Sequence, residues 1–127
     1  MWHKLVIAGT LPNLNDYIAQ LNISKFRGAE LKRTTEQRIS QSIWRHMKNL
    51  QISNPVSAHF RWYEPSKKRD LDNIAFAKKF IFDALVKCRV LKNDGWACVE
   101  GFSDSFNVDV ANPRVEVVLR VNDGLSF

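Results

Sequence analysis

The sequence predicts a single α/β (α+β) domain over residues 1–127, with a small mixed β-sheet of about four strands and helices packed against it. The first observation is size, because 127 residues with 45% hydrophobic side chains suit one core. The second is a set of short segments that alternate apolar and polar residues or are continuously apolar, as strands do. The third is a set of longer segments with helical periodicity. No internal repeat, low-complexity tract or linker divides the chain.

The first half of the chain predicts a strand, a short helix, a loop and a long helix. The signals are an apolar run, an asparagine before an amphipathic stretch, and apolar residues at helical spacing. The segments are, in order, residues 2–8, 14–21, 22–28 and 29–50. The apolar side of the long helix consists of Ile39, Ile43, Met47 and Leu50.

The second half predicts a strand, a helix and two further strands. Residues 56–63 alternate in character, and a helix then begins near Asp70 and continues to about Cys88. The apolar stripe of this helix is Ile74, Ala77, Ile81, Ala84, Leu85 and Cys88. The remaining segments are a turn at 90–95, a strand at 96–102, an irregular stretch at 103–112 and a strand at 114–121.

The chain is basic, with a formal net charge of +6 and a pI near 9.6. This charge favours a polyanionic partner, although it does not by itself separate a nucleic acid from a membrane surface. No apolar run approaches the roughly 18 residues of a membrane span, and the N-terminus lacks the pattern of a signal peptide. The two cysteines, Cys88 and Cys98, lack CxxC spacing. We therefore expect a cytoplasmic protein with no zinc site and no disulfide framework.

A basic run followed by two carboxylates is the main functional signal in the chain. Lys67–Arg69 directly precede Asp70 and Asp72, at the predicted start of a helix. The two aspartates can be explained as helix caps, which are common. Together with Asp94 in the later turn, they can also be explained as ligands of divalent cations, because Mg²⁺ prefers hard oxygen ligands. The basic run favours metal binding, since a cap does not need it and a site that brings a polyanion to carboxylates does.

The predicted helix places a lysine and a further carboxylate near these residues. On a continuous helix Lys79 and Asp83 return to about the face of Asp72, whereas Lys78 points about a third of a turn away. Lys79 and Asp83 can be an ordinary surface ion pair at i,i+4 spacing. Beside a metal, the same lysine could stabilise the negative charge that develops when a phosphodiester is attacked.

The combination of these elements is more specific than an aspartate pair alone. It comprises Arg69-Asp70-Leu71-Asp72-Asn73, a lysine in the following helix, Phe82-Asp83-Ala84-Leu85 and the loop acid Asp94. It resembles the signature of the RusA family of Holliday-junction resolvases, which are Mg²⁺-dependent structure-selective endonucleases of bacteria, phages and prophages. The motif covers about a quarter of the chain, and the order of predicted elements is compatible with the family over nearly the full length.

The resemblance implies a catalytic site and a cofactor. The implied metal ligands are Asp70, Asp72 and Asp94, and the implied catalytic lysine is Lys79. The implied ion is Mg²⁺, with Mn²⁺ able to substitute. Asn73 and Asp83 also match motif positions, and we expect them to support the site, with Asp83 spaced to hold the lysine ammonium in place.

Two departures from the family pattern leave alternatives open. The gap between Asp72 and the lysine is longer than in the best-known member, so Lys78 remains an alternative to Lys79. The loop of the family often carries two adjacent acids. Here it reads Asn93-Asp94, which leaves one carboxylate in that loop.

Basic side chains in several segments predict contacts with the DNA backbone. The expected contact residues are Lys25, Arg27, Lys32, Arg33, Lys67, Lys68 and Arg69. In the predicted loop at 22–28, Phe26 could stack on an unpaired base, although an ordinary solvated loop explains the segment equally well. Along the long helix, basic residues outnumber Glu30 and Glu36, which favours a sequence-independent contact with DNA phosphates.

These patterns together predict an Mg²⁺-dependent endonuclease that resolves Holliday junctions by paired symmetric nicks in DNA recombination and repair. A two-fold symmetric junction needs two active sites, which a homodimer provides, and the resemblance also implies a homodimer. We expect Phe76, Phe80 and Trp96 to be exposed and available for its interface. Two alternatives remain: a non-catalytic DNA-binding module, and a nuclease for other branched DNA such as flaps.

Overall fold

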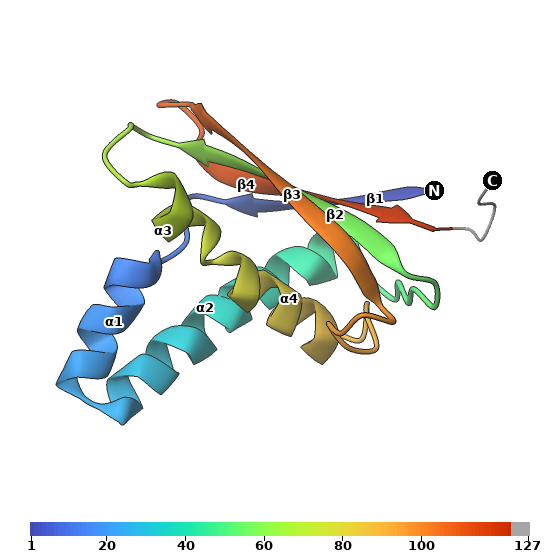
Figure 1. Ribbon diagram of the computed structural model, residues 1–127, viewed down its shortest axis with the longest axis horizontal. Helices are drawn as coiled ribbons and strands as arrows, with labels where there is room; N and C mark the ends of the chain where they lie inside the picture. Colours follow the sequence, from blue (N-terminus) through green and yellow to red (C-terminus); the bar gives the residue numbers. More distant parts are fainter. Residues whose placement is uncertain (123–127) are drawn as a thin grey trace.

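The structure, a computed structural model, describes residues 1–122 and contains one four-stranded sheet with the helices on one side of it (Figure 1). The strands are β1 (Trp2–Ala8), β2 (Val56–Glu64), β3 (Val99–Val108) and β4 (Arg114–Val121). Their order across the sheet is β1-β4-β2-β3. β4 is antiparallel to both of its neighbours, whereas β3 runs parallel to β2. The predicted α+β fold with a small mixed sheet is therefore confirmed.

The helices on this side of the sheet are one long helix, two of 10 residues each and one short helix. They are α1 (Leu14–Ile23), α2 (Lys25–His46), α3 (Leu71–Ala75) and α4 (Lys78–Lys87). α1 and α2 form a hairpin that extends away from the sheet, and α2 also packs against α4 and β1 (Figure 1). Gly28 allows the two helices of the hairpin to approach closely, because a Cβ there would lie 2.3 Å from Leu21 Cδ2. No helix within residues 1–122 has the length and apolar character needed to cross a membrane.

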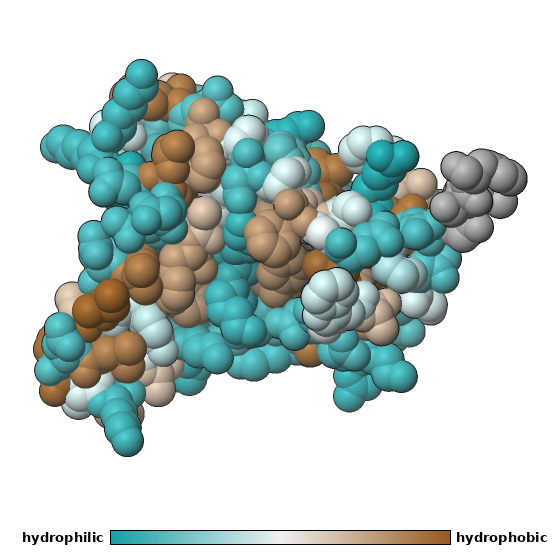
Figure 2. Space-filling view, in the orientation of Figure 1, coloured by the Kyte–Doolittle hydropathy of each residue, from teal (hydrophilic) through white to brown (hydrophobic). Residues whose placement is uncertain are grey.

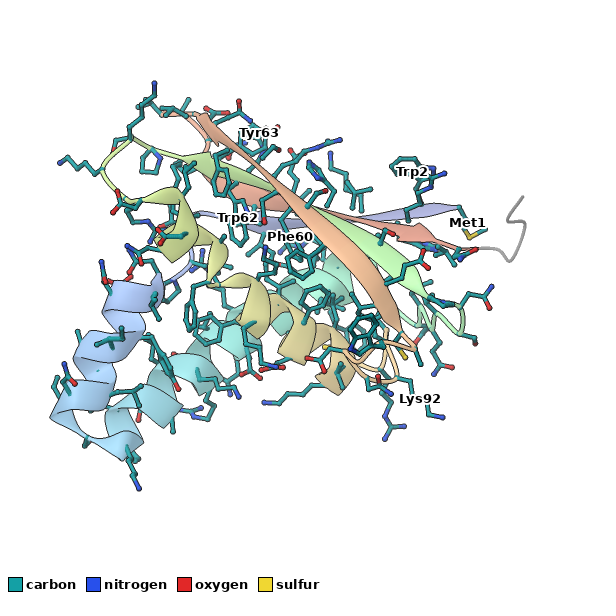
Figure 3. The ribbon with its side chains drawn as sticks, viewed as in Figure 1. Met1, Trp2, Phe60, Trp62, Tyr63 and Lys92 are labelled. Carbon is teal, nitrogen blue, oxygen red and sulfur yellow. The ribbon has the colours of Figure 1, made fainter. Side chains whose placement is uncertain are left out.

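The core lies between the sheet and the helices. β2 alternates regularly between buried and half-buried residues, since successive side chains of a strand point to opposite sides of the sheet. Phe60 and Trp62 are fully buried, and their rings stack with centroids 5.8 Å apart. Phe82 of α4 meets Phe60 edge-on at 5.5 Å. Phe60 and Trp62 lie on the helix side of β2, whereas Tyr63 lies on the other side (Figure 3). β2 is thus a firmly packed strand that leads directly into the basic loop.

The side of the sheet away from the helices carries a charged cluster. Glu116 of β4 is buried, and its carboxylate lies 2.8 Å from Arg114 Nε, 3.2 Å from Lys4 Nζ and 3.4 Å from Arg61 Nη1. Burial alone would raise the pKa of Glu116. The hydrogen bonds from Arg114 and Lys4 outweigh that effect, and the pKa is lowered.

The Glu116 carboxylate is expected to stabilise the fold in a pH-dependent way. Glu116→Gln removes the negative charge that the surrounding cations contact, so we expect the free energy of unfolding to fall by about 1–3 kcal/mol. Since the pKa is lower in the folded state, this contribution is present above the ordinary glutamate pKa and is lost as the pH falls through the folded value. Urea unfolding at about pH 7 and about pH 3 measures both effects. An equal difference between the two proteins at both pH values would contradict this account.

The predictions of a loop at 22–28 and of a long helix that starts at residue 29 are wrong. α1 ends at Ile23 and α2 begins at Lys25, so Ser24 alone links them. The Ser24 hydroxyl accepts a hydrogen bond from the Arg27 backbone N–H at 3.1 Å and caps α2. The long helix therefore occupies residues 25–46 instead of 29–50, because a serine cap starts it earlier than its apolar pattern indicates.

The predicted motif helix is divided into α3 and α4 by a turn at Phe76 and Ala77. Phe76 packs against the core and stacks on Tyr17 of α1, with ring centroids 5.7 Å apart. Phe80 is 2% exposed. The prediction that these two aromatic residues are exposed is therefore wrong, whereas Trp96 is 97% exposed.

The third strand begins and ends later than predicted. A strand was expected at 96–102 and irregular structure at 103–112, but β3 spans Val99–Val108. β3 lies at an edge of the sheet, and its polar residues pair with β2 instead of forming an apolar alternation. The hydroxyls of Ser103 and Ser105 lie 2.6 and 3.2 Å from the two ring nitrogens of His59. This cross-strand pairing has no local signal in the sequence.

Candidate active site

Asp70 and Asp72 lie where β2, the basic loop and α3 meet. α3 begins at Leu71, so Asp70 occupies the N-cap position. Its carboxylate makes no capping hydrogen bond, and both aspartates are exposed. The Asp72 carboxylate accepts a hydrogen bond from the Asn73 backbone N–H at 2.9 Å. Helix capping therefore does not account for the Asp70 side chain, which remains available to a ligand.

Arg69 fixes the loop that carries these aspartates. Its guanidinium donates two hydrogen bonds to the buried carboxylate of Glu64, at 2.8 and 3.1 Å. A third, at 2.8 Å, goes to the carbonyl of Leu11, and Asp16 of α1 lies 3.9 Å away. Arg69 thus connects the end of β2, the turn after β1 and the start of α1. It was predicted to contact DNA, but its guanidinium is engaged within the fold.

Replacing Arg69 is expected to loosen the loop. Arg69→Lys keeps the charge but cannot form the two-pronged contact with Glu64, so we expect the free energy of unfolding to fall by about 1–3 kcal/mol. Amide hydrogen exchange in residues 70–75 should become faster. The control is Lys68→Gln, which changes an exposed neighbour and should leave both quantities unchanged. Equal exchange rates in the two variants would contradict the role given to Arg69.

Lys79 lies in the first turn of α4 with its ammonium between two carboxylates. Nζ is 3.1 Å from Asp83 Oδ1 and 3.2 Å from Asp94 Oδ2. The hydrogen bonds to Asp83 and then to Asp94 raise the pKa of Lys79, so the side chain is fully protonated at neutral pH. Lys79 is exposed, so this ammonium is accessible to an anionic substrate.

A chain of ion pairs continues from this lysine to α2. Lys32 Nζ lies 3.4 Å from Asp83 and 4.0 Å from Glu36, and Lys87 contacts the same buried Glu36. Opposite charges alternate along this chain, which orders the carboxylate that contacts Lys79. Lys32 was predicted to contact DNA, and the structure places it in this network.

Lys78 is engaged in the interior instead. Its ammonium pairs with Asp104 of β3 and lies 4.1 Å from the centre of the Phe102 ring. Asp104 also accepts a hydrogen bond from Trp62 Nε1 at 2.8 Å. Sequence reasoning missed Asp104, although its alternation with Phe102 along one strand could have placed it on the helix side. This arrangement leaves Lys79, and not Lys78, as the accessible lysine in the first turn of α4.

The three predicted metal ligands are not gathered into one cluster. Within residues 1–122, no group of three or more His, Cys, Asp or Glu side chains is placed to hold a metal ion. Asp94 is paired with Lys79. Asp70 and Asp72 are exposed carboxylates with one residue between them. Neither has an ion-pair partner in the described part of the chain. Two carboxylates completed by water and phosphate oxygens are a donor set that suits Mg²⁺, so this pair fits the ion.

The predicted DNA contacts lie in two places. Lys67 and Lys68 are exposed in the loop directly before the aspartates. Lys25, Arg27 and Arg33 are exposed on α2 in the hairpin. The tip of this hairpin also carries exposed apolar side chains, visible as brown atoms at the lower left of Figure 2. These include Leu21, Ile23 and Phe26.

Exposed carboxylates near a protonated amine are the groups that an enzyme needs to cut a phosphodiester, and a net charge of +6 suits a nucleic-acid substrate. The site is therefore compatible with the class of nucleases. In comparisons with known proteins, the family described as endodeoxyribonuclease RusA matches residues 22–120. The chain therefore belongs to the RusA family of endodeoxyribonucleases, and the predicted resemblance is confirmed. No curated protein matches the chain.

Proposed function

We propose that the protein is an Mg²⁺-dependent endodeoxyribonuclease that resolves Holliday junctions by paired symmetric nicks, in DNA recombination and repair. Membership of the RusA family supports cutting of branched DNA. The observation that carries metal-dependent cutting is the Asp70–Asp72 pair. Both carboxylates are exposed without a cation partner in the described residues, and the one at the helix cap makes no capping bond.

In the proposed mechanism, Asp70 and Asp72 would hold the metal, and Asp94 would join them as a third ligand by leaving its ion pair with Lys79. Bound Mg²⁺ would polarise the scissile phosphate and lower the pKa of an attacking water. Lys79 donates hydrogen bonds to a phosphate oxygen as negative charge develops there. Its raised pKa keeps the proton on Nζ, and Asp83 keeps the ammonium oriented whether or not Asp94 remains paired with it.

We propose that the exposed basic residues bind the junction backbone. Lys67 and Lys68 would contact phosphates next to the cut, and such contacts are independent of sequence and weaken with salt. A homodimer would present two sites related by the symmetry of the junction. The apolar hairpin tip and Trp96 are exposed surfaces that we propose for its interface. The proposed location is the cytoplasm of a bacterial or phage-infected cell.

A competition assay tests this function. An immobile four-way junction, a flap and a linear duplex that share one sequence are labelled differently and offered together with Mg²⁺. We expect the junction to be cut first, at symmetric positions on two opposed strands. Equal cutting of the flap would indicate a nuclease for branched DNA in general. Binding of all three substrates without cutting would indicate a non-catalytic DNA-binding module.

A further inference from the structure

An apolar hollow lies directly beside Asp70 and has no role in the mechanism above. Its volume is about 290 Å³. Its apolar wall consists of Leu71, Ile74, Phe106 and Val108, from α3 and the end of β3. The rest of its lining, which we call its rim, is polar and consists of Glu64, Ser66, Lys67, Arg69, Asp70 and Asn107. The hollow therefore adjoins both a proposed metal ligand and a proposed phosphate contact.

The wall of the hollow restricts what can occupy it. Leu71 is 56% exposed and Val108 is 44% exposed, so apolar surface faces solvent next to a charged loop. A phosphate would lose its hydration against such a wall, and the Arg69 guanidinium that also lines the hollow is already bound to the Glu64 carboxylate. The base is the flat, mostly apolar part of a nucleotide, and it would gain from the contact. A volume close to the roughly 300 Å³ at the lower limit of small-molecule sites suits one base.

We propose that this hollow receives the unstacked base of the nucleotide next to the scissile phosphate. The proposal rests on the proposed function, because it takes the phosphate to lie at Asp70. Lys67 on the same rim would neutralise the neighbouring phosphate. A base leaves its stack most easily where it is not held in a continuous duplex, as at a branch point. The hollow would thereby contribute to selection of branched DNA over linear duplex.

Fluorescence of 2-aminopurine tests whether a base leaves the stack. The probe is placed at each position flanking the cut in a four-way junction, and Asp72→Asn is used so that the DNA remains intact. We expect fluorescence to rise on binding at one position. The same rise is expected when Val110→Phe is added, because Val110 is 76% exposed and does not line the hollow. Adding Val108→Phe, which fills the hollow, should abolish it.

Cleavage by the otherwise wild-type protein supplies a second readout. Filling the hollow with Val108→Phe should lower kcat/KM on the junction by roughly 5- to 150-fold, the equivalent of one lost base contact. An abasic site at the position where 2-aminopurine fluorescence rises should lower kcat/KM of the wild-type protein by a similar factor. The same abasic site should lower kcat/KM of Val108→Phe only slightly further. Val110→Phe should behave like the wild type in both tests.

Three results would each overturn the proposal, one from fluorescence and two from the Val108→Phe protein. One is 2-aminopurine that stays quenched at every flanking position. The other two are a Val108→Phe protein that cuts like Val110→Phe, and one whose defect is a changed oligomeric state in sedimentation, which would make the hollow a contact between protein copies. Failure of the proposed function is distinguishable, because it appears as a wild-type protein that does not cut the junction in Mg²⁺. The fluorescence of the bound, uncut junction would still report on the base in that case.

Discussion

Asp72→Asn is expected to lower the rate of junction cutting by on the order of 10³-fold or more, with junction binding retained. Asparagine is close to aspartate in shape, but its neutral amide is a poor ligand for Mg²⁺. Its side-chain oxygen can still accept the hydrogen bond from the Asn73 backbone N–H that Asp72 accepts at 2.9 Å. α3 should therefore remain folded, and the loss should be confined to chemistry.

Single-turnover cleavage and gel-shift binding separate these two quantities for Asp72→Asn. Asp109→Asn is the matched control, since the Asp109 side chain pairs with Arg114 at 2.8 Å and is not a proposed metal ligand. It should cut at close to the wild-type rate. Near-normal cutting by Asp72→Asn with unchanged binding would show that this carboxylate is not a metal ligand.

Substitution of the two adjacent lysines is expected to affect different quantities, kcat for Lys79 and stability for Lys78. Lys79→Met should lower kcat by about 10²- to 10³-fold, because it removes a donor aimed at developing charge. Stability should change little, since the side chain is 60% exposed. Lys78→Met should lower the free energy of unfolding by about 1–3 kcal/mol, because it leaves Asp104 without its cation in a mostly buried place. Its activity per folded molecule should be retained.

Urea unfolding and single-turnover cleavage on both lysine variants measure this contrast. The pair is well matched, because each variant makes the same chemical change at neighbouring positions of one helix. A stable but inactive Lys78→Met beside an active Lys79→Met would reverse the assignment. It would make Lys78 the catalytic lysine and would require the ion pair with Asp104 to open during the reaction.

Local patterns predicted much of this fold. The alternation at 56–63 and 114–121 found β2 and β4, because one side of each strand packs against the helices and the sequence records that burial. An asparagine at position 13 or 15 signalled the start of α1, and in the structure Asn13 is the cap, because its side chain accepts a hydrogen bond from the Asp16 backbone N–H at 2.9 Å. The aspartate motif was likewise visible in the sequence, because its basic prefix and the spacing of its carboxylates are local features.

Features that depend on distant partners could not be predicted. The turn between α3 and α4 places Phe76 against Tyr17, which comes from another helix far along the chain. The charges of Arg69 and Lys32 were visible in the sequence, but their partners within the fold were not. Glu64 and Asp83 meet them only once the chain has folded. Asp104 was missed for the same reason, since it contacts Lys78 and Trp62 across the core.

The most direct test of the central claim uses a supercoiled plasmid that extrudes a cruciform. A first nick releases the supercoiling and collapses the cruciform, so linear DNA forms only when two opposed strands are cut within one binding event. We expect linear plasmid in Mg²⁺ and no product in EDTA. Nicked circles as the main product, or linear DNA formed without a divalent metal, would contradict it.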